Sequence, residues 1–437
     1  MIAITNIRKS LEKLFADEKF VKRFTIGLAI TVAVGMVLSV LKMRNHYLDL
    51  YVFLDASQHT MNGQDIYTTL SGRGLPYLYL PLIAVLFIPL SMLPYVVAGA
   101  IWMGMSAALL GLTIAMFVRG MLGGAFSELS PFEKWALHLI PVIFCFDAIT
   151  AEIGAGQVNG LTLAITVLGL FLAARGKKIY GGFALGIAFV AKVFSAPVIA
   201  YQAFSGRMKV VLGAAIGLAV GLGLPSLIYG PQKNLDYIVY WTTNIAFHTD
   251  LRTHPLSFFG NGSLQAVIAR LFSEGAAFVY DGKLYSMTIA VIDPTILKWT
   301  GLAIEFSIIL VLFAYRMIFR RSHSIVSYWG GVALALCVAP LITNVTERYH
   351  FVLLLPGYVY VTYLWICVRL KGKGFYALLF ATFALSTLTL RIYVGAYLGM
   401  VFWSLGAPSL AALTLSAAIF YAGFLLRNRD LDKLAVD

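Results

Sequence analysis

Three aspartates stand out in residues 44–81, the first long polar interruption of an otherwise largely apolar chain. Asp49 directly follows the first apolar stretch, so its carboxylate would meet a substrate at the membrane surface. There it could accept the proton of a hydroxyl group as that group attacks. A solvated or helix-capping acid is the structural alternative, for Asp55 as well. It applies most strongly to Asp65, because residues 62–65, Asn-Gly-Gln-Asp, have the composition of a turn.

Lys192 lies inside an apolar stretch and is the most informative single residue by energy. An ionised lysine at mid-membrane costs roughly 2.5–3.5 kcal/mol, so Lys192 needs an anionic partner or contact with water. In one interpretation the Lys192 side chain extends to the membrane surface or pairs with an acid such as Asp147. In the other it binds a lipid phosphate. Arg348 and His350, in the short polar stretch 344–350, are further candidates for a phosphate, although a single interfacial histidine is often structural.

The composition assigns the chain to the integral membrane proteins. Of its 437 residues, 60% are hydrophobic and 12% are charged, which leaves too little polar surface to cover a soluble globule of this size. The net charge of +13 comes mostly from Lys and Arg at the ends of apolar segments. This pattern is typical of membrane topology and of contact with anionic lipid, so we expect membrane lipids and no nucleic acid as partners.

Several classes of site are not found in the sequence. Cys145, Cys337 and Cys367 each lie in an apolar run, so they predict neither a disulfide framework nor a zinc site. No Walker A loop, HExxH or GxSxG motif is present. Paired outer carboxylates at DxD spacing, which would hold a metal, are missing too. We therefore expect no metal and no cofactor.

The apolar segments predict about twelve transmembrane helices in one integral membrane domain, residues 1–437, with both ends in the cytoplasm. Residues 1–23 are expected to form a cytoplasmic amphipathic helix. Residues 44–96 form a first outer loop, in which the proline-rich stretch 77–94 lies along the membrane, and residues 230–294 form a second. The expected crossings are 24–42, 97–118, 135–152, 161–174, 181–204 as two half-crossings meeting near Lys192 and Pro197, 210–229, 295–318, 325–343, 351–368, 375–390 and 400–426.

This topology collects polar groups on the outer side. Asp49, Gln157, Asn159 and Lys192 share that side with the second outer loop and with residues 347–350. The inner side carries mostly basic residues at the ends of the expected helices. We therefore expect the functional site at the outer face.

Seven motifs resemble those of glycosyltransferase family 87 and follow the same order as in that family. Together they cover most of the chain. That family consists of polyprenyl-phosphate-mannose-dependent mannosyltransferases with the multi-spanning GT-C fold. His350 matches the second of two adjacent histidines, while Tyr349 takes the place of the first and Glu347 that of a nearby tryptophan. The motifs are DLYVFLDA from Asp49, NGQDIY from Asn62, YLYLPLIA from Tyr77, GQVN from Gly156, the Lys192 segment, NGSL from Asn261, and His350 followed by LLLP from Leu353.

The resemblance implies an inverting sugar transfer from a lipid phosphate, with Asp49 as the general base. Lys192, Arg348 and His350 are the candidates for binding the donor phosphate. A polyprenyl phosphate leaves as an anion without needing a proton, so one base and cationic groups suffice. The expected substrate-binding residues are Asp55, Tyr77, Gln157, Asn159 and Asn261.

We thus expect a glycosyltransferase, a hexosyltransferase, that moves a sugar, mannose by the resemblance, from a polyprenyl-phosphate donor to a glycolipid or glycan. Nucleotide sugars are not expected outside the cytoplasmic membrane, so an enzyme acting at its outer face needs a lipid-carried donor. The alternative is a transporter or flippase of a lipid-linked glycan. Two halves with matching hydropathy, which a repeat-built transporter would tend to show, are not evident.

Overall fold

The computed structural model describes residues 49–72, 74–246, 260–275, 277–319 and 324–427, with residues 10, 12–17, 19–27, 30 and 34 nearer the N-terminus. The described chain is helical almost throughout. Its strands, β1 (Phe278–Tyr280) and β2 (Lys283–Tyr285), form one antiparallel hairpin. The prediction of an all-α membrane protein is confirmed in this coarse form, and the hairpin is an addition to it. The expected span 24–42 lies mostly outside the described residues.

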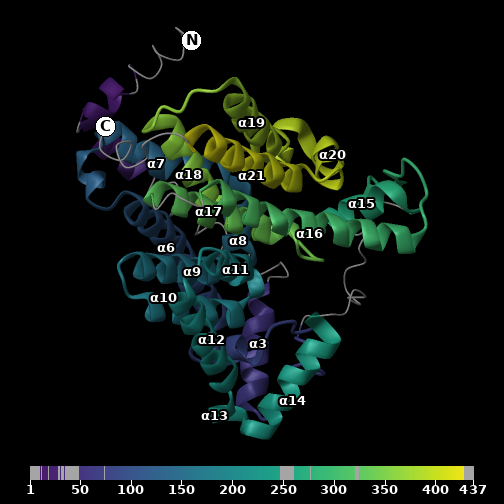
Figure 1. Cartoon of the computed structure of the whole chain (residues 1–437). Helices are drawn as coiled ribbons and strands as arrows, with labels where there is room; N and C mark the ends of the chain where they lie inside the picture. The colour runs from purple at the N-terminus through teal and green to yellow at the C-terminus, as the bar shows by residue number, and fades with distance from the viewer. Residues whose placement is uncertain are drawn as a thin grey trace.

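The helices form two groups, which Figure 1 shows below and above one another. The lower group contains α3 and α9–α14, and the upper group contains α15–α21. In chain order the helices are α3 (Asp49–Met61), α4 (Pro81–Leu86), α5 (Ile88–Ser91), α6 (Tyr95–Leu122), η2 (Gly123–Glu128), α7 (Pro131–Phe144), α8 (Phe146–Ala155), α9 (Asn159–Ala174), α10 (Lys178–Ala191), η3 (Val193–Ser195), α11 (Ala196–Phe204), α12 (Met208–Gly223), α13 (Ser226–Tyr229), α14 (Pro231–Trp241), η4 (Thr242–Ala246), α15 (Leu264–Phe272), α16 (Pro294–Ile318), α17 (Ile325–Val338), η5 (Ala339–Leu341), η6 (Arg348–Leu354), α18 (Leu355–Ile366), α19 (Lys373–Phe383), η7 (Ala384–Leu388), α20 (Arg391–Ser404) and α21 (Ala407–Leu426).

In the described part of the chain, five helices are long and apolar enough to cross a membrane, or up to seven if each of two bent pairs is one span. Four shorter apolar helices accompany them. The number of crossings, about twelve, therefore stays a prediction. The expected straight span 135–152 is instead α7 and α8, bent by 69°. The expected span 400–426 is a candidate crossing only from Ala407 onward. Gly406, at φ +79°, separates α20 from α21 in the left-handed conformation that favours glycine.

The predicted first outer loop folds, where it is described, as short helices around α3. Helices α4 and α5 have six and four residues and both pack against α3. At a rise of about 1.5 Å per residue, neither approaches the roughly 30 Å of a bilayer core. Residues 77–94 therefore do not form a spanning helix, as the prolines predicted. The described part of the predicted second outer loop holds α14, η4, α15 and the hairpin.

The N-terminal amphipathic segment is helical where it is described, at residues 12–16 and 19–27. Its aromatic side chains lie against α7, where Phe15 packs with Phe20, Phe132 and Trp135. The apolar face of the segment therefore packs against α7.

The stretch 181–204 breaks where the sequence predicted. Helix α10 ends at Ala191, Lys192 has an extended backbone, and α11 returns after the short helix η3. Helices α10 and α12 run parallel, because Gly182 faces Val210 and Gly186 faces Ala214. The two GxxxG pairs that make this close approach possible are Gly182 with Gly186 and Gly213 with Gly217.

Replacing Gly186 by alanine is expected to lower the free energy of unfolding by about 1–3 kcal/mol, as overpacking of a tight contact does. The added Cβ would overlap the carbonyl oxygen of Ala214. A thermal unfolding scan of purified protein would measure the loss. Gly111→Ala is the matched control, because a Cβ at Gly111 meets nothing within 4 Å. Equal melting temperatures for the two variants would contradict the tight α10–α12 packing.

Basic residues gather at one end of the helices. Arg119 lies in the last turn of α6, and Arg175 caps the end of α9. The guanidinium of Arg207 lies 3.7 Å from the ring centre of Tyr328, at the start of α17. Tertiary contacts bring these ends together, since Gly120 of α6 faces Trp329 of α17 and Gly423 of α21 faces Tyr315 near the end of α16. We call this end the basic end.

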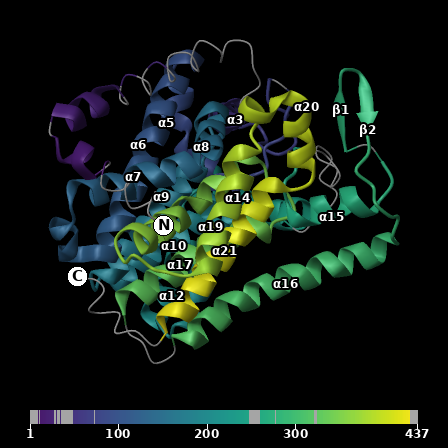
Figure 2. The same ribbon diagram turned by 90° about the horizontal axis from the view of Figure 1, so that it is seen from above.

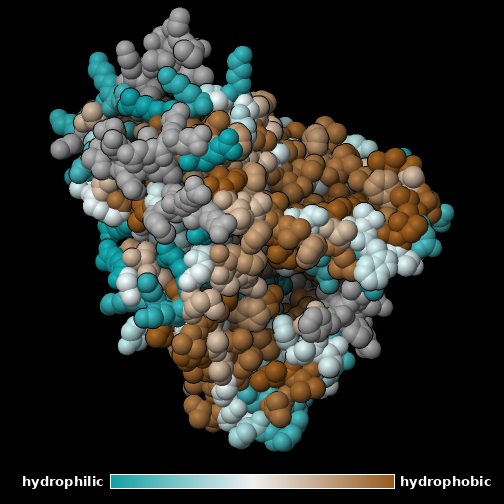
Figure 3. Space-filling model, in the orientation of Figure 1, coloured by the Kyte–Doolittle hydropathy of each residue, from teal (hydrophilic) through white to brown (hydrophobic). Residues whose placement is uncertain are grey.

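Helices α17 and α18 form the centre of the upper group and are buried almost completely. Helix α16 instead runs along the edge of the molecule, as Figure 2 shows. Large apolar side chains such as Trp299, Phe306 and Phe313 are exposed on it. Figure 3 shows a broad apolar surface across the middle of the molecule, with hydrophilic residues at its margins. This distribution fits a surface that lipid surrounds.

Candidate active site

A cavity of about 280 Å³ lies where α3, the end of α10, the end of α14 and η6 meet. Its polar lining includes Asp49, Gln157, Lys192, Glu347 and His350. Helix α9 begins beside the cavity and ends at the basic end, while α10 runs from the basic end up to Lys192. The cavity and the basic end therefore lie at opposite ends of the same helices.

Asp49 is the first residue of α3, and its Oδ2 accepts a hydrogen bond of 2.6 Å from Nε2 of Gln157. The hydroxyl of Tyr79 donates to Oε1 of the same glutamine at 3.1 Å. Burial, reinforced by the nearby Asp49 carboxylate, raises the pKa of the Tyr79 phenol well above its usual value. Tyr79 therefore remains a donor and fixes which end of the Gln157 amide faces Asp49.

Gly156 makes this approach of Gln157 possible. It ends α8 in the left-handed conformation, at φ +68°, which glycine adopts without strain. A Cβ at this position would lie 2.7 Å from Cβ of Leu50 in α3. The indole of Trp102 also donates to the carbonyl of Gly156 at 2.9 Å. The turn between α8 and α9 is thus held directly against α3.

Lys192 and His350 come together across 158 positions of the sequence. The Nζ of Lys192 lies 2.9 Å from Nε2 of His350. The other ring nitrogen, Nδ1, accepts a hydrogen bond of 2.9 Å from the backbone N–H of Glu347. A neutral imidazole that accepts at Nδ1 carries its proton on Nε2, so a donor faces the donor ammonium. Such a pair is completed by an anion that accepts from both groups.

The surroundings of Lys192 are aromatic. Its ammonium lies 5.2 Å from the ring centres of Tyr79 and Phe194 and 5.7 Å from that of Tyr349. Aromatic faces stabilise a partly desolvated cation without neutralising it. The rings thus offset part of the cost of burying the Lys192 ammonium.

The comparisons with known proteins give one family. The sequence model of glycosyltransferase family 87 matches residues 77–343, more than half of the chain. The chain belongs to glycosyltransferase family 87. The resemblance noted in the sequence is thereby confirmed. No curated protein and no solved structure matches the chain.

Some of the residues that line the cavity of this family 87 glycosyltransferase lie within the matched region, and others lie outside it. Tyr79, Gln157 and Lys192 lie inside the matched residues, whereas Asp49 and His350 lie outside them. The structure brings both sets together in one cavity. Their shared location therefore rests on the fold of this chain.

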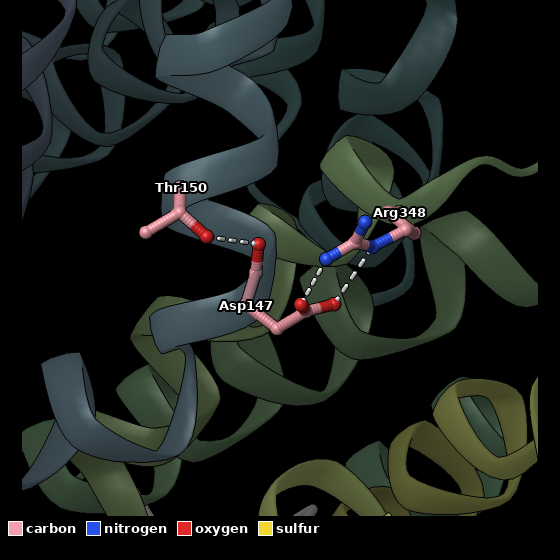
Figure 4. A network of polar contacts seen from close by, with 3 residues as sticks. All are labelled: Asp147, Thr150 and Arg348. Atoms are coloured by element: carbon pink, nitrogen blue, oxygen red, sulfur yellow. Dashed lines mark hydrogen bonds and ion pairs between the residues drawn. The ribbon is translucent and has the colours of Figure 1, made fainter. Parts of the chain in front are cut away.

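Arg348 of the glycosyltransferase turns to Asp147 on α8, as Figure 4 shows. Its Nε donates to Oδ2 of Asp147 at 3.1 Å, and its Nη2 contacts Oδ1. Arg348 is not among the described residues that line the cavity. The acid considered as a partner for Lys192 is thus engaged by Arg348. This ion pair joins η6, which carries His350, to α8.

Replacing Arg348 by glutamine is expected to change the KM for the donor less than threefold and to cost about 1 kcal/mol of stability or less. The ion pair is substantially exposed, with 51% of the Arg348 side chain and 22% of the Asp147 side chain accessible, and solvent screens such pairs. Steady-state kinetics and thermal unfolding measure the two quantities. Lys192→Gln serves as the comparison, because its KM should rise far more. An equal rise in both variants would contradict this expectation and keep Arg348 among the candidates for binding a donor phosphate.

Four other predicted site residues have structural partners and are not among the described residues that line the cavity. Asp55 accepts from the backbone N–H of Gly72 at 2.7 Å. Tyr77 donates to the carbonyl of Leu80, and Asn261 accepts from the backbone N–H of Thr346 at 3.0 Å. Asn159, the fourth, is buried in contact with Glu152. These residues shape the loops around the cavity. Asp65, predicted as a turn residue, accepts from the backbone N–H groups of Tyr67 and Thr68.

Glu152 is a buried carboxylate that the sequence analysis did not single out. It accepts from Nδ2 of Asn159 at 2.7 Å and from the backbone N–H of Gly160 at 2.6 Å. It thereby satisfies a donor at the start of α9, where a negative charge is favourable. In the sequence, Glu152 could have been noticed as an acid within an apolar segment, four residues before Gly156. Glu152 joins the end of α8 to the start of α9 and so fixes the turn between them, from which Gln157 reaches Asp49.

Proposed function

We propose that this chain transfers a sugar, mannose, from a polyprenyl-phosphate donor to a hydroxyl group of a glycolipid or glycan. The observation that carries the proposal is the shared cavity of a carboxylate, Asp49, and two facing donors, Lys192 and His350. The carboxylate supplies a base, and the donors supply a place for a phosphate. Membership of glycosyltransferase family 87 fixes the reaction class.

In the proposed reaction, the acceptor oxygen attacks the anomeric carbon while Asp49 takes its proton. The bond between the anomeric carbon and the phosphate oxygen breaks, and the electron pair leaves with the polyprenyl phosphate. Lys192 and His350 stabilise the charge that develops on that phosphate. A single displacement of this kind inverts the anomeric configuration. The leaving phosphate needs no proton, so one base is enough.

The cavity lining also suits a lipid-carried substrate. Apolar and aromatic residues, among them Phe189, Val190, Trp241 and Ile245, line it beside the polar groups. An isoprenoid chain gains free energy from such a lining, at about 25 cal/mol for each Å² removed from water. A nucleotide sugar would gain nothing comparable. This favours a lipid-linked donor.

The charge distribution supports a site at the outer face of the cytoplasmic membrane. Lys and Arg are enriched on the cytoplasmic side of membrane proteins. The basic end would then lie inside, and the cavity, at the other end of α9 and α10, would face the exterior. Reporter fusions test this orientation, since a cytoplasmic reporter should be active after residue 176 and inactive after residue 157.

The decisive experiment uses purified protein in liposomes with labelled polyprenyl-phosphate sugars and a panel of membrane lipid acceptors. The proposal predicts label in the acceptor, fastest with mannose, and release of polyprenyl phosphate. Label that moves between leaflets without changing carrier would identify a flippase instead. That result would overturn the proposal.

A further inference from the structure

Glu347 is a second carboxylate in the cavity lining, and the reaction described above gives it no role. It comes three positions before His350, at the start of η6. The two residues hold each other in place: the Glu347 side chain accepts from the backbone N–H of His350, and Nδ1 of His350 accepts from the backbone N–H of Glu347. Glu347 therefore has a fixed position next to the proposed phosphate site.

The chemistry of Glu347 differs from that of its neighbours. A carboxylate only accepts hydrogen bonds, and it repels a phosphate. Its natural ligands in a polar cavity are hydroxyl groups, of which a hexose carries several. In the donor, the sugar is bonded directly to the phosphate, so the group beside the phosphate site faces the sugar ring. Tyr349, two positions further along the chain, hydrogen-bonds Glu347 through its side chain and also lines the cavity.

We infer that Glu347, supported by Tyr349, binds hydroxyl groups of the donor's sugar and selects the sugar that the enzyme transfers. This inference rests on the proposed function, because it assumes a sugar attached to the phosphate held by Lys192 and His350. It goes further by assigning a sugar subsite. Hydrogen bonds to a charged acceptor are among the stronger ones, so their loss is measurable.

The test compares two lipids that differ only in the sugar, polyprenyl phosphate and polyprenyl-phosphate mannose. Equilibrium binding to the protein in nanodiscs is measured for the wild type, Glu347→Gln, Lys192→Gln and the matched control Glu128→Gln, whose side chain is exposed at the end of η2. We expect Glu347→Gln to weaken binding of the mannosylated lipid about 10- to 100-fold and to leave binding of the bare phosphate unchanged. Lys192→Gln should weaken both.

The remaining outcomes are decisive as well. Equal weakening of both lipids in Glu347→Gln would show a structural role, and equal tightening would show that Glu347 only neutralises Lys192; either overturns the sugar subsite while the phosphate site stands. If the wild type bound neither lipid, the proposed function itself would fail and the subsite with it. Retained binding of the bare phosphate also shows that the variant is folded.

A second measurement identifies the hydroxyl group. Monodeoxy analogues of the mannosylated lipid are titrated against the wild type and Glu347→Gln. One analogue should bind the wild type about as weakly as the full donor binds the variant, and the variant should not distinguish the two. A variant that still discriminates among the analogues as the wild type does would refute the assignment.

Discussion

Replacing Asp49 by asparagine is expected to lower kcat about 10²- to 10⁴-fold, the usual contribution of a positioned general base. Asparagine keeps the size of the side chain and can still contact Gln157, but it cannot take the proton of an attacking hydroxyl. The affinity for the donor lipid should change little, because the proposed phosphate site consists of other residues, Lys192 and His350. Transfer of labelled sugar in liposomes measures kcat, and donor binding in nanodiscs measures affinity.

Asp236→Asn is the matched control, since Asp236 is exposed on α14 and its carboxylate accepts from Gln232 within the same helix. Its kcat should equal that of the wild type. Asp49→Glu adds one methylene and displaces the carboxylate, and a displacement of about 1 Å can cost 10²-fold in rate. Full transfer by Asp49→Asn would remove Asp49 from the mechanism. Lipid translocation that is insensitive to both Asp49 variants would favour a transporter.

Replacing Lys192 by glutamine should raise the KM for the donor about 10- to 100-fold, which is the contribution of a hydrogen bond to a charged group. The substitution removes one of the two donors that face each other at 2.9 Å. The KM for the acceptor should stay near its wild-type value, because the acceptor carries its hydroxyl to Asp49. Initial rates measured with each substrate varied in turn separate the two constants.

Lys177→Gln controls for the loss of a positive charge, since Lys177 is exposed at the basic end. Lys192→Arg keeps the charge and should recover part of the affinity. A rise in the acceptor KM alone would contradict the assignment of Lys192 to the phosphate. Since Asp49→Asn should act on kcat and Lys192→Gln on the donor KM, the two variants test separate parts of one mechanism.

The sequence predicted the features that depend on local composition. The break at Lys192 followed from basic residues at both ends of one apolar stretch. The prolines of 77–94 predicted that this stretch does not cross the membrane. The division of 400–426 was missed, because an apolar run does not reveal that Gly406 adopts a left-handed conformation. A positive φ at glycine depends on the surrounding fold as well as on the residue.

Contacts between distant segments were harder to predict. Gln157 reaches Asp49 across 108 positions, and Arg348 reaches Asp147 across 201. Sequence placed Asp49, Gln157 and Arg348 near one face, and Asp147 within an expected crossing. It could not choose partners, since the choice depends on side-chain directions within packed helices. The inventory of cationic residues made Arg348 a candidate for the phosphate, whereas the structure turns it to α8. Glu347 entered only as a departure from the family pattern, and its place in the cavity became evident from the fold.

The parallel packing of α10 and α12 has a consequence for how the chain is assembled in its membrane. Helices α10 and α11, with 14 and nine residues, are each short for a full crossing. The glycine face of α10 is covered by α12, which the ribosome makes later. The hairpin that carries Lys192 therefore lacks part of its packing until residues 208–223 are made. We expect a chain that stops before them to be less stable than one that includes them.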